Sequence, residues 1–500
     1  MVEETLLMGK EARRKLLQGI NKVADAVKGT LGPSAKTVII QQEDSFPLIL
    51  NDGVSVARAV NDPDPYVQMG IDLIKQVAEQ AQGVSGDGTT TATVIAQALC
   101  NEGFKEIEDG RDRLELFEMI QEKVAEIIRN IEGHSQPCED TIDDISAVAR
   151  IAANNDQELG DLIADVMLNI GSEGAIALKH GSGFETTFEI KDGLEIQSGA
   201  VSPHFSQEMA NANVLITTDK INNFESLVPA LELSLKEQKG LLIVCADYNE
   251  SMLPNLLINV VQGKINACLV KLPSMGKQQE DWANDIRAVT GGKVFNKTLG
   301  DSLTTVKEQD LGYATLVQCG KDSCVLETDT GIDEAHLDDL YQAVEEADHD
   351  WDKQTLTRRL ARLNRGVASI YVGATTEIEM LEKKERIDDA INAVRAAMRN
   401  GYIAGGGILL NYYGMDSKDD LIMKAFSAPM RTIAENAGID LPPTMHVERG
   451  LDARTGKLDA DLVAVGIIDP VDITINSIRS AVSIAKLVLL SDALVALPQS

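Results

Sequence analysis

The chain has 500 residues and a formal net charge of −32, because 46 Lys and Arg face 78 Asp and Glu. A chain this long predicts about three domains and a core that needs neither disulfides nor metals to fold. The acidic balance and the 4 % aromatic content disfavour phosphate backbones, anionic lipid and base stacking, so we expect no nucleic-acid and no membrane partner.

The cysteines are scattered and form no CxxC pair, a pattern that indicates reduced thiols rather than a zinc site or a disulfide framework. They are Cys100, Cys138, Cys245, Cys268, Cys319 and Cys324. The six histidines are equally scattered, so we expect no metal cluster. The segment Met1–Lys10 is too short and too acidic for a targeting peptide. We therefore expect a cytoplasmic protein.

The first 135 residues predict a mainly helical segment. Apolar residues recur at helical spacing over Val67–Ala81 and Val94–Leu99, and the β-branched run Thr37–Gln41 predicts a strand. A turn-rich stretch before Pro137 favours a boundary there.

From about residue 224 helical and strand patterns alternate. We expect helices at Phe224–Glu237, Met252–Gln262 and Asp281–Val289. We expect strands at Leu241–Ala246, Ala267–Leu272 and Lys293–Phe295. Repeated β-α units of this kind predict a largely parallel sheet covered by helices, in an α/β domain of its own.

Helical patterns dominate the remainder, at Ala343–Arg362, Glu377–Asn400 and Ile478–Leu490, with the glycine turn Gly405–Gly407 between the last two. An α-rich start and end around an α/β centre predict an insertion, in which the two chain ends share one domain. The predicted fold class is therefore multidomain α and α/β.

The strongest local motif is Gly86-Asp87-Gly88-Thr89-Thr90-Thr91, between two helical patterns. Free N–H groups at a helix start, close-approach glycines and three hydroxyls make a phosphate cradle, in which Asp87 can hold Mg²⁺. A capped helix whose threonines satisfy its own N–H groups explains the same residues about equally well.

Other candidates are weaker when taken alone. The turn Thr30–Pro33 suits a plain helix end, Asn51–Gly53 suits an ordinary Asp-Gly turn, and Asp389 lies on a helix of balanced charge. Carboxylates from separate segments become chemically useful beside a magnesium-bound phosphate, where one holds metal and another orients or deprotonates water.

The helix at Met252–Gln262 is apolar over an arc of about 240°, wider than docking on one sheet requires. With the neighbouring helix Phe224–Glu237 it predicts an apolar groove for peptide segments. Coverage by other helices of the same domain explains this surface about as well.

These motifs together resemble the group I (GroEL-type) chaperonins. The resemblance rests on Thr30–Pro33, Asp52–Arg58, Gly86–Val94, Ala404–Gly407 and Gly466–Pro470 in the order and spacing of that family. It implies an equatorial domain from 1–135 and 401–500, an intermediate hinge domain from 136–190 and 367–400, and an apical domain at 191–366. The implied function is an ATP-dependent ring chaperone, an ATPase.

The resemblance also implies an ATP site in the equatorial domain. Phosphates would contact Thr30, Leu31, Gly32, Pro33, Gly88, Thr89, Thr90 and Thr91. Asp87 would hold Mg²⁺, with K⁺ as a further cation, and Asn51 would lie beside the phosphates. Gly406, Asp452, Ala453 and Asp469 would line the nucleoside, and Asp389, assisted by Asp52, would promote hydrolysis.

Implied partners are non-native polypeptides, other copies of the chain in a ring of seven, and a co-chaperonin lid. Clients would bind Phe205, Val228, Leu231, Leu253, Leu257 and Ile258.

Three departures from the family pattern surround the ATP site: Asn51 replaces a lysine, Asp452 an asparagine and Arg454 a small residue. Less positive charge there predicts weaker nucleotide binding. A shorter segment between Leu410 and Pro429 puts ring contacts in question. The alternative is therefore a structural or holdase ring without productive ATP turnover, and a small-molecule phosphotransferase is a third hypothesis.

Overall fold

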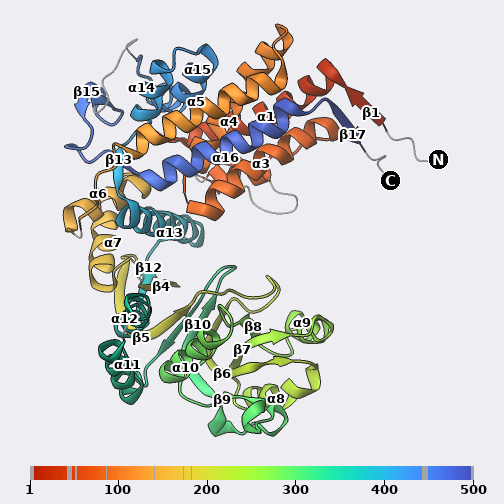
Figure 1. Ribbon diagram of the computed structural model, residues 1–500, viewed down its shortest axis with the longest axis vertical. Coiled ribbons are helices and arrows are strands. Elements are labelled where there is room, and N and C mark those ends of the chain that lie inside the picture. Colours follow the sequence, from red (N-terminus) through yellow and green to blue (C-terminus); the bar gives the residue numbers. More distant parts are fainter. Residues whose placement is uncertain are drawn as a thin grey trace. The chain divides into compact units, whose positions relative to one another are not determined.

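The structure is a computed structural model. It describes residues 5–41, 48–50, 53–85, 87–139, 141–172, 174–181, 183–347, 349–441 and 449–496. The chain divides into two compact units, one made of Met1–Leu168 with Ala374–Ser500 and the other of Asn169–Gly373 (Figure 1). We call them unit 1 and unit 2. The two ends of the chain thus share a unit, whereas the finer division into three domains stays a prediction.

Unit 1 is built around a buried C-terminal helix. Helix α16 (Val471–Leu490) packs against α3 (Pro65–Ser85), α4 (Thr89–Glu108) and α5 (Arg113–Glu132). By length and composition α16 could cross a membrane, but 67 % of its most apolar stretch is buried inside the protein. Its apolar residues therefore serve as the centre of a helical core.

The other helices of unit 1 surround this core. They are α1 (Gly9–Val27), α2 (Gly53–Ala59), α6 (Ile142–Ala152), α7 (Gln157–Ile170), α13 (Glu377–Asn400), α14 (Ile408–Asp416) and α15 (Asp420–Ala437). Helices α1 and α3 cross closely because Gly19 and Gly70 face each other's backbone: a Cβ on Gly19 would lie 2.1 Å from the Val67 carbonyl oxygen. The helix predicted at Glu377–Asn400 is confirmed.

Short antiparallel strand pairs join distant segments of unit 1. They are β1 (Thr5–Met8) with β17 (Ala493–Ala496), β2 (Val38–Ile40) with β3 (Leu48–Leu50), β13 (Tyr402–Ala404) with β16 (Ile468–Pro470), and β14 (Arg449–Asp452) with β15 (Lys457–Asp461). The strand predicted at Thr37–Gln41 is β2. The pairing of β1 with β17 brings the first and last described residues together.

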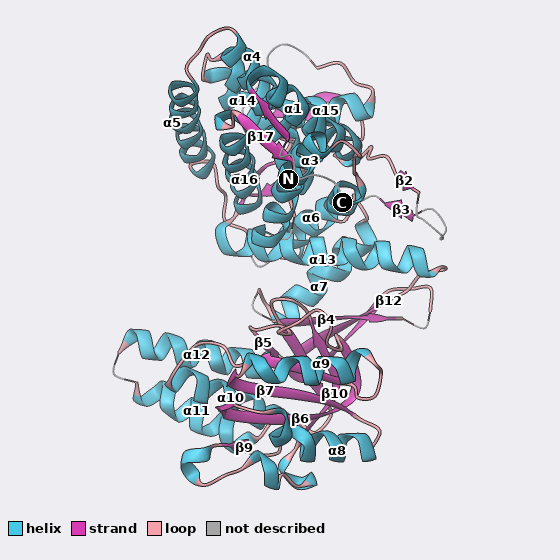
Figure 2. Cartoon of the chain, turned by 90° about the vertical axis from the view of Figure 1, so that its right-hand side faces the viewer, coloured by secondary structure: helices cyan, strands magenta, loops and turns pink. Residues whose placement is uncertain are grey.

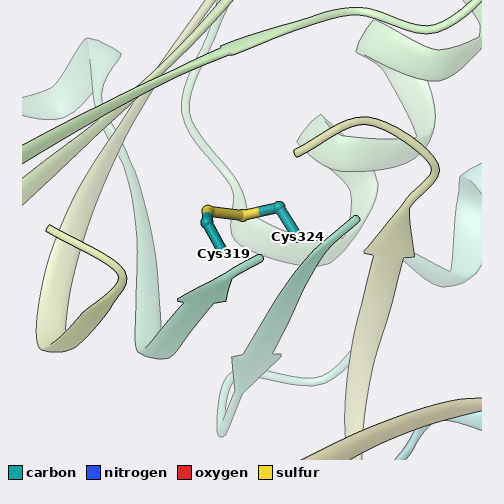
Figure 3. Close-up of a disulfide and its surroundings, with 2 residues drawn as sticks. All are labelled: Cys319 and Cys324. Carbon is teal, nitrogen blue, oxygen red and sulfur yellow. A yellow bond between two sulfur atoms is a disulfide. The ribbon is translucent and has the colours of Figure 1, made fainter. Parts of the chain in front are cut away.

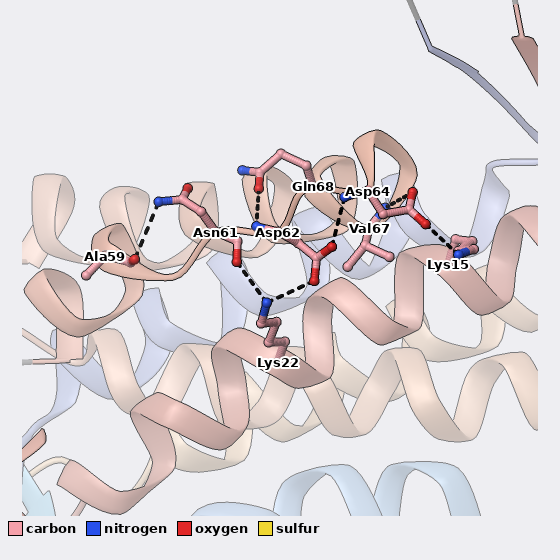
Figure 4. Close-up of polar contacts among 8 residues, drawn as sticks. All are labelled: Lys15, Lys22, Ala59, Asn61, Asp62, Asp64, Val67 and Gln68. Carbon is pink, nitrogen blue, oxygen red and sulfur yellow. Dashed lines mark hydrogen bonds and ion pairs between the residues drawn. The ribbon is translucent and has the colours of Figure 1, made fainter. Parts of the chain in front are cut away.

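The connection between α2 and α3 is fixed to α1 by two lysines (Figure 4). Lys22 donates to the Asp62 carboxylate at 2.9 Å and Lys15 to the Asp64 carboxylate at 2.5 Å. These hydrogen bonds hold the pKa of both carboxyls below the usual value. Asp64 also accepts from the Tyr66 backbone N–H at the start of α3, so one carboxylate caps a helix and fixes it to a neighbour.

Unit 2 contains a nine-stranded mixed sheet, shown as magenta arrows in Figure 2. Its order is β4 (Ala175–His180), β12 (Val367–Val372), β5 (Thr187–Ile196), β11 (Cys324–Thr328), β10 (Gly312–Cys319), β6 (Glu208–Ile221), β7 (Gly240–Tyr248) and β8 (Ala267–Lys271), with β9 (Val294–Phe295) also beside β6.

The prediction of a largely parallel sheet is correct for β6 to β9, and β4 and β12 also pair parallel. Strands β5, β10 and β11 pair antiparallel with their neighbours. Only Gly320–Ser323 separate β10 from β11, too short a connection for the helical crossover that parallel strands need. No helical pattern lies between β10 and β11 in the sequence. The prediction relied on strands that alternate with helices, and it therefore missed these strands.

Helices cover both faces of this sheet. Figure 1 shows α8 (Val228–Lys236) and α9 (Leu253–Val261) on one side, and α10 (Lys277–Thr290), α11 (Glu334–Glu346) and α12 (Asp350–Arg365) on the other. The single helix predicted at Ala343–Arg362 is wrong, because the chain turns between α11 and α12. Both helices are fixed to α10 through buried Asp285, which pairs with His336 at 2.9 Å and with Arg359 at 2.7 Å.

The prediction that every cysteine is a reduced thiol is wrong for one pair. Cys319 and Cys324 form a disulfide (Figure 3). They face each other at the end of the β10–β11 hairpin, with their Cα atoms 3.9 Å apart. Only strand pairing brings them together, since their spacing matches no common cysteine motif. Cys100, Cys138, Cys245 and Cys268 are not part of a disulfide.

We therefore predict that the denatured, unreduced chain exposes the four thiols outside the disulfide, and all six cysteines after reduction. Thiol titration in denaturant, with and without prior reduction, measures both numbers. Six thiols without reduction would show that the pair at the end of the hairpin is not oxidised in the isolated protein.

Candidate functional site

A pocket in unit 1 collects the residues that the resemblance assigns to ATP. Its lining includes Thr30, Leu31, Gly32, Pro33, Asp87, Gly88, Thr89, Thr90, Thr91, Asp389, Gly406, Asp452, Ala453 and Asp469. Asn51 and Asp52 lie outside the described residues. The structure therefore brings the described part of the predicted set together from both ends of the chain, while the role of each residue stays a prediction.

The start of α4 forms one wall of the pocket. Gly88, the N-cap residue, has a φ of 88° and no capping side chain, and a Cβ there would lie 2.4 Å from Ser477 Oγ. Ser477, on α16, donates to the Gly88 carbonyl oxygen at 3.0 Å. Glycine is thus required by conformation and by packing. The helix start, with its partial positive charge, points toward the pocket and suits an anion.

The turn Thr30–Pro33 lies against this helix start. Thr30 Oγ1 donates to the Val27 carbonyl oxygen at 2.8 Å and lies 3.2 Å from Thr90 Oγ1. The two hydroxyls join segments that are far apart in the sequence. Their contact places a second set of backbone groups beside the N-terminus of α4.

An acidic pair forms another part of the pocket. Burial, together with the nearby charge of Asp87, raises the pKa of Asp469 to about 6, against a hydrogen bond from the Gly406 N–H that lowers it. Two carboxylates that repel each other are the donor set a Mg²⁺ ion shares with phosphate oxygens. No group of three or more His, Cys, Asp or Glu suited to a metal occurs among the described residues, so phosphate would have to complete the coordination.

Asp452 and Arg454, which depart from the family pattern in the segment predicted to line the nucleoside, compensate each other's charge. Arg454 donates from its backbone N–H and from Nε to Asp452 Oδ1, both at 3.0 Å. Burial alone would raise the pKa of Asp452, but these hydrogen bonds outweigh it and hold the pKa below its usual value. The expected extra negative charge is therefore neutralised within the loop, which corrects the sequence-based argument for weaker nucleotide binding at this position.

Helix α13 supplies a wall that carries Asp389. On the same wall lie Glu382 and Arg386, which the sequence analysis missed. Arg386 pairs with Glu382 at 2.9 Å and with Asp156 at 3.5 Å. Because Glu382 precedes Arg386 by four residues, the helical spacing of opposite charges was a usable signal.

The end of α6 closes the pocket beside α13 and was also missed. Asn154 and Asn155 line it and have positive φ values of 57° and 65°. Asparagine adopts this conformation more readily than other residues with a side chain. The Asn-Asn pair after a helical pattern was therefore the signal for a sharp helix end.

The predicted client-binding residues of unit 2 divide by burial. Phe205 and Leu231 are core residues, 3 % and 7 % exposed, and do not form part of an exposed face in this structure. Val228, Leu253 and Leu257 are half-buried. Ile258 on α9 is 53 % exposed, and Val261 on the same helix is 68 % exposed. Part of the broad apolar arc of this helix is thus covered by its own unit and part faces outward.

We predict that Asp469→Asn stabilises the nucleotide-free protein increasingly as the pH rises. The folded carboxyl has a pKa of about 6, above its unfolded value, so the wild type loses stability as the pH rises through this window. An asparagine still accepts from Gly406 but carries no charge. Between about pH 5 and about pH 7.5 the stability difference should grow by about 1 kcal/mol, measured by denaturant unfolding. A pH-independent difference would contradict the assigned cause.

Comparison with known proteins agrees with this architecture. The chaperonin gp146 from bacteriophage EL 2 (Pseudomonas aeruginosa), crystallised in the presence of ATP-BeFx, has the same fold. Its two crystal forms match with TM-scores of 0.72 and 0.65, at 21 % identity over 99 % of each chain. The sequence model of the TCP-1/cpn60 chaperonin family matches residues 23–499. The chain is a member of the TCP-1/cpn60 chaperonin family, with the chaperonin fold.

Proposed function

We propose that this chaperonin is an ATP-driven ring chaperone that binds ATP with Mg²⁺ in the pocket of unit 1. The observation that carries the proposal is the convergence there of the α4 start, the Thr30–Pro33 turn, the Asp87–Asp469 pair and Asp389. A similar protein, gp146, was crystallised with ATP-BeFx. Phosphates are held by backbone N–H groups and threonine hydroxyls. Bound Mg²⁺ would neutralise phosphate charge beside Asp87.

Hydrolysis needs a group that orients or deprotonates water, and Asp389 is the candidate. It lines the pocket from α13, a different segment from the one that carries Asp87. Nucleotide contacts that differ between two conformations of the subunit shift the equilibrium from one conformation to the other. The subunit captures a non-native chain in one conformation and releases it in the other. Hydrolysis returns the subunit to its starting conformation. Seven subunits per ring, a co-chaperonin lid and a K⁺ requirement are part of the same proposal.

We expect Asp389→Ala to bind ATP within about threefold of the wild type while its turnover falls by a factor of about 10² or more. Equilibrium binding and phosphate release with Mg²⁺ and a denatured client measure the two effects. Asp388→Ala is the matched control, since it removes the neighbouring carboxylate of the same helix, which is not among the residues that line the pocket.

Turnover by Asp389→Ala equal to that of the wild type would contradict the role of this residue. Wild-type protein that binds client but releases no phosphate would instead establish the holdase ring. That alternative retains the support of Asn51 and the short segment after Leu410, but Arg454 removes the argument from Asp452.

Client binding is proposed at the outward face of α9. Ile258→Ser should weaken capture of a denatured protein several-fold, because it removes about 1–2 kcal/mol of apolar contact, and should leave ATP turnover unchanged. Leu299→Ser is the matched control, an exposed leucine on another segment of unit 2. Suppression of client aggregation measures capture. Equal losses in both variants would show that capture does not depend on this face.

A further inference from the structure

Asn436 connects helix α15 to the turn before the pocket. Its side-chain amide nitrogen donates to the carbonyl oxygens of Lys28 and Leu31, both at 2.9 Å. Lys28 is the first residue of the single 3₁₀ turn Lys28–Thr30 that ends α1, and Leu31 follows this turn. An amide NH₂ has two donors, so Asn436 bonds both carbonyls at once. The Lys28 carbonyl oxygen also accepts from the Leu31 N–H at 3.3 Å.

These two bonds also fix the direction of the backbone. In a trans peptide the C=O and the following N–H point in opposite directions, and the described chain has no cis peptide bond. With the Leu31 carbonyl directed toward α15, the Gly32 N–H points away from α15. Gly32 itself lines the pocket. By binding the Leu31 carbonyl, Asn436 therefore fixes the N–H end of the Leu31–Gly32 peptide on the side away from α15.

A second residue of α15 supports the same turn. Gly32 has a φ of 86°, and a Cβ there would lie 3.1 Å from the side chain of Ile433. Helix α15 therefore contacts the turn through Ile433 and holds it by hydrogen bonds through Asn436. Neither residue is a notable motif in the sequence.

We propose that Asn436 is a positioning residue for the phosphate-contacting turn Thr30–Pro33. Its hydrogen bonds direct the carbonyl oxygens of Lys28 and Leu31 toward α15, so that these oxygens do not repel phosphate. The same bonds hold the turn in one conformation. This proposal rests on the proposed function, because it needs ATP to bind in this pocket. It predicts an effect on phosphate recognition that leaves nucleoside recognition intact.

The test compares ATP with adenosine, which lacks phosphates, on the full-length chain. Asn436→Leu keeps the volume but removes both donors, and should raise the Kd of ATP about five- to thirtyfold, the equivalent of two ordinary hydrogen bonds. The Kd of adenosine should change less than about twofold and turnover at saturating ATP less than about threefold. Asn101→Leu, which breaks the Asn21–Asn101 amide pair in unit 1, is the control and should bind ATP normally.

Asn436→Asp is a second variant with nearly the native shape. Its ionised carboxylate cannot donate, whereas its protonated form regains one donor. Its ATP affinity relative to the wild type should therefore recover as the pH is lowered. This arm decides the matter if Asn436→Leu does not fold.

The outcomes separate the two proposals. Wild-type ATP binding with unchanged ATP affinity in both Asn436 variants would overturn only the role of Asn436. Equal weakening of ATP and adenosine would also overturn it, since that is the result of a general loss of structure. Wild-type protein that binds adenosine and ATP equally weakly would overturn the proposed function, and the role of Asn436 with it.

Discussion

The burial of α16 among helices from the other end of the chain is the constraint on which unit 1 depends. Its apolar residues are buried mainly against α3, α4 and α5, with α13 as a further neighbour, so the last helix returns to the first ones. The contact has a chemical consequence, because Ser477 on α16 meets Gly88 at the start of α4. The hydrophobic core thereby sets where the helix N-terminus of the pocket lies and which segments can surround it.

The pocket holds two carboxylates, Asp87 and Asp469, that repel each other, and the packed core keeps them in place. Asp87 and the burial of Asp469 make ionisation of Asp469 unfavourable, an arrangement that no isolated turn would keep. Such perturbed carboxyls cluster where a protein binds cations or charged substrates. In the proposed function, a cation bound at this pair would lessen the repulsion between the two carboxylates.

The loop around Asp452 shows that a departure from a family pattern has to be judged with its neighbours. An acidic residue in the nucleoside stretch looks unfavourable alone, yet Arg454, two residues later, neutralises it through the backbone and the side chain. Both changes were visible in the sequence. Their compensation was not, because the distance between two side chains in a loop depends on a conformation that residue spacing does not define.

The sequence by itself determined the secondary structure with strong periodicity and the division into helical and α/β parts. The motifs that carry the family resemblance also predicted part of the pocket lining, from Thr30–Pro33 to Asp469, but not Asn154, Asn155, Glu382 and Arg386. Tertiary structure alone decided the rest. The antiparallel strands β5, β10 and β11, the Cys319–Cys324 pairing, the burial of Phe205 and Leu231, and the contact of Asn436 with the Lys28–Leu31 turn all depend on segments distant in sequence. Local sequence patterns do not indicate which distant segment an element contacts, because that contact depends on how the whole chain packs.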